Sequence, residues 1–314
     1  MSAWQFTGTN QPLVRAEVQT PAPGPDEVVI DVKAAGLCHT DVGVLYDEGW
    51  LSTIIRTPIT MGHEVAGVIS QLGENVTGWQ VGDRVGVCPT TELGAPGFLY
   101  DGGFGEQVVV GAIALVKIPD NVSLAAGAAG TDAGMTSHSA VMGAGQVKAG
   151  DKVGIIGIGG LGQIGMKVAT LAGAQVWVAE VNEESWPLAK KLGAQGVAKS
   201  ITEFADVGLD VIIDFAGFDT LGGALETLRF GGRVVVVGMG RLEATISTKA
   251  LILSAATIIG SVGGTKEDVA AVYEHISTGA LDPVMTEITF DEIPEGLKRL
   301  EEGNVIGRLV AVRD

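Results

Sequence analysis

Hydrophobic and polar positions follow different patterns in the two parts of the chain. Between residues 1 and 120, short apolar runs are separated by turn residues, as in EVVIDVKAAG at 27–36 and FGEQVVV at 104–110. Runs of this kind predict β-strands. Farther along, apolar runs alternate with helical segments, as in VGIIG at 153–157 followed by LGQIGMKVATLAG at 161–173. This alternation predicts an α/β fold with a doubly wound parallel sheet.

Six apolar runs are expected to form that sheet, at 153–157, 176–181, 196–200, 211–217, 233–239 and 257–264. Residues 124–145, rich in alanine, glycine and serine, predict a helix that crosses between two domains. The segment after residue 265 combines two amphipathic helices with strand material. We expect this tail to fold back on the first domain.

Composition narrows the classes of function. The net charge of −17 over 314 residues argues against nucleic acid or an anionic membrane as a partner, because both are bound through clustered Lys and Arg. Two cysteines are too few for a disulfide framework, and the opening residues lack the layout of a secretory signal, which favours a cytoplasmic protein. Residues 153–181 are nearly uncharged, but their glycines favour a strand, a helix and a second strand over a membrane span.

A glycine motif follows the first strand of the predicted sheet. Gly157, Gly159 and Gly162 match GxGxxG, which allows a tight turn, close approach of a pyrophosphate and close helix packing. Glu180 ends the next strand and is placed to bind the adenosine ribose, and no Arg or Lys follows it to bind a 2′-phosphate. The sequence predicts NAD rather than NADP, held by Gly157, Gly159, Gly160, Leu161, Gly162 and Glu180. The alternative is a glycine-rich packing turn that binds no nucleotide.

A cysteine and a histidine lie on turns flanking two strands of the first domain. Cys38 is in GLCHTD and His63 is in GHEVAG. Thiolate and imidazole together suit zinc. A single buried cysteine or a single histidine is usually structural, but both occur here in longer motifs upstream of a dinucleotide fold. We therefore expect a metal site.

These motifs resemble the zinc-dependent alcohol dehydrogenases of the medium-chain dehydrogenase/reductase superfamily. The likeness covers nearly the whole chain, from PGPDEVVIDVKAAGLCHTD through MGHEVAGVI to the final GRLV. It implies a mainly β, GroES-like catalytic domain formed by residues 1–132 and 266–314, and a Rossmann-type NAD-binding domain formed by residues 133–265. It also implies a homodimer or homotetramer that uses NAD and one catalytic zinc ion per subunit to oxidise a small alcohol to an aldehyde or ketone, or to catalyse the reverse reaction.

The resemblance assigns the metal site residue by residue. Cys38 and His63 match two zinc ligands, and Glu64 matches an acid that can exchange onto the metal. Asp41 matches the carboxylate that holds a ligand imidazole in the correct tautomer. Thr40 matches the hydroxyl group that takes the alcohol proton and passes it to the cofactor ribose.

Further residues are assigned to the cofactor and the substrate. His39 and Arg308 match groups near the cofactor pyrophosphate, and Thr136 matches a position near the nicotinamide. Tyr46 and Trp50 could line an apolar substrate pocket. The identity of the substrate depends on loop packing that one sequence does not reveal.

Three positions depart from the family pattern. Asp132 stands where a cysteine usually provides the third zinc ligand; the alternative is that it caps the following helix. Cys88 stands alone where relatives carry a four-cysteine lobe, so no structural zinc is expected. Gly43 replaces a histidine that ends the proton relay in many relatives, so we expect the proton to leave through water and a Gly43→His substitution to be tolerated.

The expected function is therefore zinc- and NAD-dependent alcohol dehydrogenation. One alternative is a zinc-independent enone or quinone reductase of the same superfamily, which would not need Cys38, His63 and Asp132 together. The other is a non-catalytic nucleotide-binding structural relative, which would not need the residues of hydride transfer.

Overall fold

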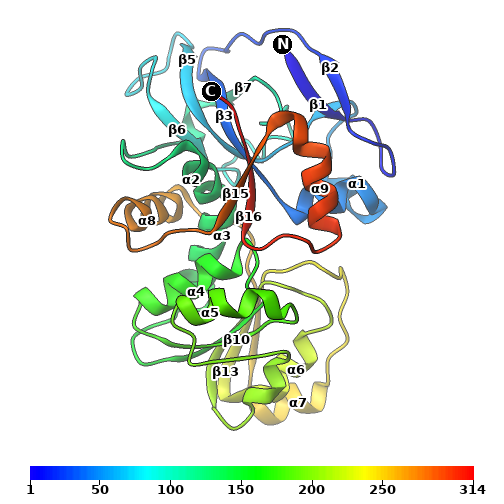
Figure 1. Ribbon diagram of the computed structural model, residues 1–314, viewed down its shortest axis with the longest axis vertical. Coiled ribbons are helices and arrows are strands. Elements are labelled where there is room, and N and C mark those ends of the chain that lie inside the picture. Colours follow the sequence, from blue (N-terminus) through cyan, green and yellow to red (C-terminus); the bar gives the residue numbers. More distant parts are fainter. The chain divides into compact units, whose positions relative to one another are not determined.

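The computed structural model describes residues 1–314 and contains two compact units (Figure 1). Unit 1 consists of Met1–Ala133, Thr265–Gly279 and Met285–Asp314, and unit 2 consists of Gly134–Gly264 and Ala280–Val284. The expected domain boundaries differ from these at single residues and at the segment 280–284. That segment belongs to unit 2 because the Gln163 side chain donates to the carbonyl oxygen of Val284 and accepts from its N–H group, both at 2.8 Å.

Unit 1 is built mainly from β-strands. Its larger sheet has seven strands in the order β15-β16-β3-β5-β6-β8, with β7 also paired to β3. These strands are β3 (Glu27–Leu37), β5 (Glu64–Leu72), β6 (Arg84–Val87), β7 (Gln107–Gly111), β8 (Leu115–Lys117), β15 (Met285–Thr289) and β16 (Arg308–Val312). A three-stranded sheet, ordered β2-β1-β4, is formed by β1 (Ser2–Phe6), β2 (Val14–Glu17) and β4 (Ile59–Thr60).

Unit 1 also contains helices. They are α1 (His39–Tyr46), α2 (Leu124–Ala129), α8 (Lys266–Ser277) and α9 (Ile293–Glu301), with 3₁₀ turns η1 (Glu48–Thr53), η2 (Ala112–Ala114) and η7 (Phe290–Glu292). Strand β16 pairs antiparallel with β3, and Figure 1 shows the red C-terminal strand beside the blue β3. The prediction that the tail folds back on the first domain is confirmed. Side chains from β3, β5 and α9 share one hydrophobic core.

Unit 2 contains the predicted parallel sheet. Its six strands follow the order β11-β10-β9-β12-β13-β14, and every neighbouring pair is parallel. They are β9 (Lys152–Ile156), β10 (Gln175–Ala179), β11 (Gly196–Ala198), β12 (Leu209–Asp214), β13 (Leu228–Val236) and β14 (Thr257–Gly260). Valine and isoleucine are the commonest apolar residues of β9 and β12, as expected where helices cover both faces of a sheet. The doubly wound α/β fold is confirmed.

Helices accompany this sheet in unit 2. They are α3 (Met135–His138), α4 (Gly162–Leu171), α5 (Trp186–Lys191), α6 (Leu221–Thr227) and α7 (Thr248–Ser254), with 3₁₀ turns η5 (Glu183–Ser185) and η6 (Ile201–Phe204). Helix α4 contacts β9 and β10, and α6 contacts β12 and β13. The uncharged run 153–181 therefore forms a strand, a helix and a strand, as predicted.

The predicted helix at 124–145 is present, but it is not a regular α-helix. Helix α2 continues through the π-helical turn η3 (Gly130–Gly134) into α3 and then into a second π-helical segment, η4 (Ser139–Ala144). A π-helix is rare and often marks a functional site. The first of these two segments carries Asp132.

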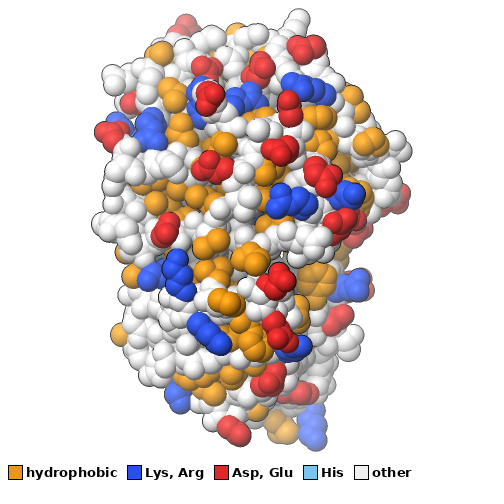
Figure 2. Space-filling view, viewed as in Figure 1, with side chains coloured by type: hydrophobic (Ala, Val, Ile, Leu, Met, Phe, Trp, Pro, Cys, Tyr) orange, Lys and Arg blue, Asp and Glu red, His pale blue; other side chains and the backbone are white.

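Charged side chains of both signs cover the surface. On the face shown in Figure 2, Lys and Arg side chains are interspersed with Asp and Glu rather than gathered into one basic area. None of the helices combines the length and the apolar character that crossing a membrane requires.

Candidate metal centre and nucleotide-binding loop

Four potential metal ligands meet in unit 1. Each of Cys38, His63, Glu64 and Asp132 offers one ligand atom, and these atoms all lie within 4.8 Å of one another. Cys38 follows β3, His63 precedes β5, and Glu64 is the first residue of β5. Because β3 and β5 are antiparallel neighbours, the end of one lies beside the start of the other, with Gly36 opposite Glu64. The sheet register thus brings the two sequence motifs together.

Asp41 connects the cysteine motif to the histidine motif. Its Oδ2 accepts a hydrogen bond from the backbone N–H of Cys38 at 3.0 Å, and its Oδ1 lies 3.2 Å from Nδ1 of His63. A carboxylate at Nδ1 fixes the imidazole with its proton on that nitrogen and leaves Nε2 as the ligand atom. Nε2 lies 3.5 Å from Oδ2 of Asp132, so it faces the other potential ligands.

The charges around His63 favour a cation. Burial acts to lower the pKa of His63, but the negative charge of Asp41 and hydrogen bonds to Asp132, Asp41 and Cys38 outweigh it and raise the pKa well above its usual value. A largely buried group of one thiol, one imidazole and carboxylates has the donor chemistry of a zinc site. These residues fit zinc.

Asp132 lies inside a continuous helical segment. It is the third residue of η3, and α3 begins only at Met135, after Gly134 in helical conformation and without a side-chain cap. The alternative prediction, that Asp132 caps the start of the following helix, is therefore wrong, because no helix starts there. Its side chain is directed to His63 instead.

Glu64 is held by an arginine from the end of the chain. Arg308 Nε donates to Glu64 Oε2 at 3.0 Å, and a terminal guanidinium nitrogen donates to Oε1. Oε1 also accepts from the backbone N–H of Ala133 at 3.1 Å. Burial acts to lower the pKa of Arg308, but the charge of Glu64 outweighs it and raises the pKa. Sequence reasoning placed Arg308 near the cofactor phosphates and missed this pairing, for which no local pattern gives a signal.

Gly36 is required for this arrangement. A Cβ atom on Gly36 would lie 1.7 Å from Glu64 Oε2, so any side chain there would displace the carboxylate. The glycine in the GLCHTD motif thus creates the space in which the Glu64 carboxylate meets Arg308.

Two further predicted residues lie on the first turn of α1. The Thr40 hydroxyl oxygen is 3.6 Å from Cys38 Sγ, so it lies beside the potential ligand thiolate. His39 is exposed on the same turn. Neighbouring residues displace part of the water around this exposed imidazole, which lowers the pKa of His39, and the nearby positive charge of Arg308 lowers it further.

The GxGxxG loop of unit 2 has the geometry that its glycines predict. Gly157 has φ +83°, which favours glycine, and a Cβ on Gly162 would lie 1.9 Å from the carbonyl oxygen of Gly157. A Cβ on Gly159 would meet nothing within 4 Å, so open space lies beside this residue. Gly160 and Leu161 form the turn that leads into α4, and the Leu161 carbonyl accepts a hydrogen bond from the Ser137 hydroxyl at 2.9 Å. This loop can receive a pyrophosphate.

Glu180 lies beside the loop, directly after β10. One carboxylate oxygen accepts from the backbone N–H of Ile158 at 2.9 Å, and the other accepts from the N–H of Asn182 at 2.7 Å. The strand end therefore holds the acid at the glycine-rich turn. Thr136, on α3, is buried in the same unit.

Trp50 fills the space next to Gly43. A Cβ on Gly43 would lie 2.7 Å from Nε1 and 2.9 Å from Cε2 of the indole. Gly43→His would therefore require the indole to move, and the expectation that this substitution is tolerated stays a prediction. Tyr46, at the end of α1, is 44% exposed, whereas Phe98 packs edge-on against the His63 ring with centroids 5.2 Å apart. The buried Phe98 ring thus forms an apolar wall at the metal cluster.

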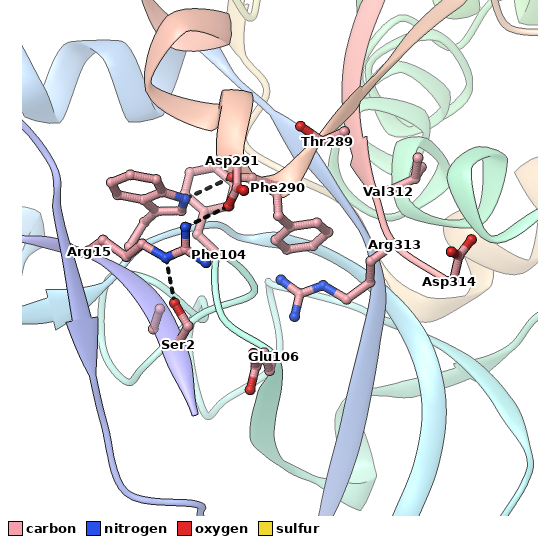
Figure 3. A pocket seen from close by; sticks show the side chains of 12 residues that line it. Ser2, Arg15, Phe104, Glu106, Thr289, Phe290, Asp291, Val312, Arg313 and Asp314 are labelled. Atoms are coloured by element: carbon pink, nitrogen blue, oxygen red, sulfur yellow. Dashed lines mark hydrogen bonds and ion pairs between the residues drawn. The ribbon is translucent and has the colours of Figure 1, made fainter.

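A cavity of about 650 Å³ lies elsewhere on unit 1 (Figure 3). Trp4, Arg15, Phe290 and Arg313 are among the side chains that line it, and none of the potential zinc ligands does. Arg15 reaches across its rim and pairs with Asp291 at 2.8 Å. This cavity is distinct from the candidate metal centre.

Comparison with known proteins agrees with this geometry. Residues 24–120 match the family model of the alcohol dehydrogenase GroES-like domain, and residues 160–278 match that of zinc-binding dehydrogenases. An alcohol dehydrogenase from Geobacillus stearothermophilus is 31% identical, over 96% of this chain and 96% of the relative.

Solved structures of two relatives are similar to this structure over nearly the whole chain. An alcohol dehydrogenase from Aeropyrum pernix is 29% identical with a TM-score of 0.92 and covers 100% of both chains. An acetophenone reductase from Geotrichum candidum, solved in complex with NAD, is 28% identical with a TM-score of 0.91, over 99% of this chain and 97% of that one. The chain therefore belongs to the zinc-binding alcohol dehydrogenases of the medium-chain dehydrogenase/reductase superfamily, the family that its motifs predicted.

Proposed function

We propose that this protein is a zinc- and NAD-dependent alcohol dehydrogenase, which interconverts a small alcohol and the corresponding aldehyde or ketone. The observation that carries the proposal is the convergence of Cys38, His63 and Asp132 with Asp41 behind the imidazole. A zinc-independent reductase of the same superfamily would not require this set.

In this proposal Cys38, His63 and Asp132 hold one catalytic zinc ion, and Asp41 keeps Nε2 of His63 free to coordinate it. Zinc, when bound, supplies Lewis acidity that favours loss of the substrate hydroxyl proton. The Thr40 hydroxyl, which lies beside the Cys38 sulfur, would accept that proton while releasing its own proton toward the cofactor ribose. Arg308 restrains Glu64, so Glu64 serves as a reserve ligand rather than a permanent one.

We also propose that unit 2 binds NAD through the GxGxxG loop, with Glu180 accepting hydrogen bonds from the adenosine ribose. NAD, when bound, supplies the acceptor or donor of hydride. His39, Thr136 and Arg308 are proposed cofactor contacts, and Tyr46 and Trp50 are proposed boundaries of the substrate pocket. The NAD complex of the Geotrichum relative supports this choice of cofactor.

A homodimer or homotetramer in the cytoplasm is part of the same proposal. Strand β14 is the last strand of the parallel sheet, and its Ile259 side chain is 37% exposed. An open strand edge with apolar side chains is suited to pairing with a second copy.

Metal analysis combined with a substitution tests the proposed function. We expect about one zinc per chain after dialysis, because one ligand set is present, and NADH formation with a panel of alcohols. Asp132→Ala should lose both zinc and activity. Two zinc equivalents would contradict the absence of a structural site, and full zinc content in Asp132→Ala would remove Asp132 from the ligand set.

A further inference from the structure

The potential ligand Asp132 depends on an irregular piece of helix. The π-helical turn η3 shifts the backbone hydrogen bonding by one residue relative to α2, which precedes it. Carbonyl groups at such a junction lose the regular α-helical pairing and need other donors. The direction of the Asp132 side chain therefore depends on what holds this turn.

Tyr273, from α8, supplies one of these donors. Its hydroxyl group donates to the carbonyl oxygen of Gly127, in the last turn of α2, at 2.9 Å, although the two residues are 146 positions apart. Tyr273 is 1% exposed and is among the largest fully buried side chains of the protein. It is thus a fixed part of the interior.

The backbone around η3 is shaped to receive this ring. A Cβ on Gly130, the first residue of η3, would lie 2.5 Å from Cε1 of Tyr273. A Cβ on Gly86, in β6, would lie 1.9 Å from the Tyr273 hydroxyl oxygen and 2.9 Å from the Thr131 methyl group. Two glycines therefore allow the phenol to lie directly against the residues that precede Asp132.

The residue that follows Asp132 is also fixed by a hydrogen bond. The backbone N–H of Ala133 donates to Glu64 Oε1, whose carboxylate is bound by Arg308. Asp132 thus lies between two anchors, a phenol acting on Gly127 and Gly130 and a carboxylate acting on Ala133.

We propose that Tyr273 is a positioning residue of the metal centre: through its hydroxyl group it holds η3 so that the Asp132 carboxylate reaches the zinc. The inference rests on the proposed function, because it takes Asp132 as a ligand. Tyr273 acts through Asp132 and makes no contact with the metal itself.

Tyr273→Phe tests the inference, since it keeps the ring and removes only the hydroxyl group. We expect zinc affinity, measured by competition with a chromophoric chelator, to fall roughly 10- to 100-fold, the range found when outer partners of metal ligands are removed. We also expect the visible absorption of the cobalt-substituted protein to shift, because the Asp132 oxygen changes its position at the metal.

Tyr100→Phe is the matched control. The Tyr100 hydroxyl is buried in unit 1 without a hydrogen-bond partner, so its removal should leave zinc affinity and the cobalt spectrum unchanged. Gly86→Ala is the second variant; its new Cβ should displace the Tyr273 hydroxyl and weaken zinc binding while the phenol is retained.

The outcomes separate the inference from the proposed function. If Tyr273→Phe unfolds at a lower temperature but keeps wild-type zinc affinity and cobalt spectrum, Tyr273 is a packing residue only and the inference is overturned. Wild-type protein that binds no zinc, or Asp132→Ala that binds it normally, would refute the proposed ligand set itself. If Tyr273→Phe does not fold, wild-type zinc affinity in folded Gly86→Ala overturns the inference.

Discussion

Arg308 and Glu64, 244 positions apart in the sequence, form a buried ion pair beside the candidate metal centre. Nε of Arg308 donates to Oε2 of Glu64 at 3.0 Å, and the Glu64 carboxylate also accepts from the backbone of Ala133. Neither side chain is more than 3% exposed. Each charge therefore depends on the other, because water cannot replace a lost partner.

Breaking this pair should destabilise the protein strongly. We expect Arg308→Met to lower the free energy of unfolding of the metal-free protein by roughly 3–5 kcal/mol, since it leaves the Glu64 charge buried and unpaired. Urea denaturation followed by circular dichroism measures the change. Arg308→Met combined with Glu64→Gln should recover part of the loss. Arg56→Met is the control, because Arg56 and its partner Asp101 are half-exposed. It should lower the free energy of unfolding by less than about 1 kcal/mol. An equal loss of stability in Arg308→Met and Arg56→Met would show that burial of the pair makes no difference.

Asp41→Asn should weaken metal binding. Its amide oxygen can still accept from Cys38 N–H, but its amide group then donates to Nδ1 of His63, which moves the imidazole proton to Nε2 and blocks coordination. We expect zinc affinity to fall about 10- to 100-fold in a chelator competition. Asp31→Asn, where the carboxylate accepts from Gln107 instead, should bind zinc like the wild type. Unchanged affinity in Asp41→Asn would show that the tautomer of His63 is set by another group.

Glu180 should determine the choice between NAD and NADP. A 2′-phosphate carries a charge of about −1.5 to −2 and would be repelled by the Glu180 carboxylate, so we expect tighter binding of NADH than of NADPH in a fluorescence titration. Glu180→Ala should weaken NADH binding and narrow the ratio between the two dissociation constants. Glu226→Gln, an exposed change on α6, should leave the ratio as it is. Comparable affinities for both cofactors in the wild type would mean that Glu180 does not face the ribose.

Gly43 should resist substitution because of Trp50. Alanine normally stabilises a helix relative to glycine, but here its Cβ would overlap the indole, so we expect Gly43→Ala to lower the free energy of unfolding by about 1–3 kcal/mol. In a Trp50→Ala background the same change should be neutral or stabilising. Gly222→Ala, in α6 with open space around the new Cβ, should be stabilising in either background. If Gly43→Ala still lowers the free energy of unfolding in the Trp50→Ala background, a group other than the indole must clash with the new Cβ.

We expect Asp210 to make the free energy of unfolding fall as the pH is lowered in the acid range. Burial acts to raise its pKa, but the backbone N–H of Lys152 and the guanidinium of Arg229 outweigh burial and lower it. Because the folded pKa lies below the unfolded value of about 3.9, the stabilisation is complete above that pH and is lost as the pH falls through the folded value. The difference in unfolding free energy between wild type and Asp210→Asn should therefore shrink on acidification. A difference that stays constant with pH would contradict the argument.

Much of the fold could be predicted because it is encoded locally. The GxGxxG motif lies within six consecutive residues, and the apolar runs of β9 and β12 predict buried parallel strands from composition alone. Cys38 and His63 were identified from their short motifs. The ligand position of Asp132 was inferred from resemblance, and the helix around it was predicted without its π-helical turn, since no residue pattern distinguishes a π-turn from an α-turn.

By itself, the sequence determined the two architectures, the nucleotide loop and the residues able to bind a metal, because periodicity and short motifs act over a few neighbouring residues. Only the tertiary structure decided which distant groups meet. The pairing of Glu64 with Arg308, the placement of Trp50 on Gly43 and the contact of Tyr273 with Gly127 each depend on how the strands and helices pack. Such contacts produce no periodic pattern in the sequence, because they form only when packing brings side chains of complementary shape and charge together.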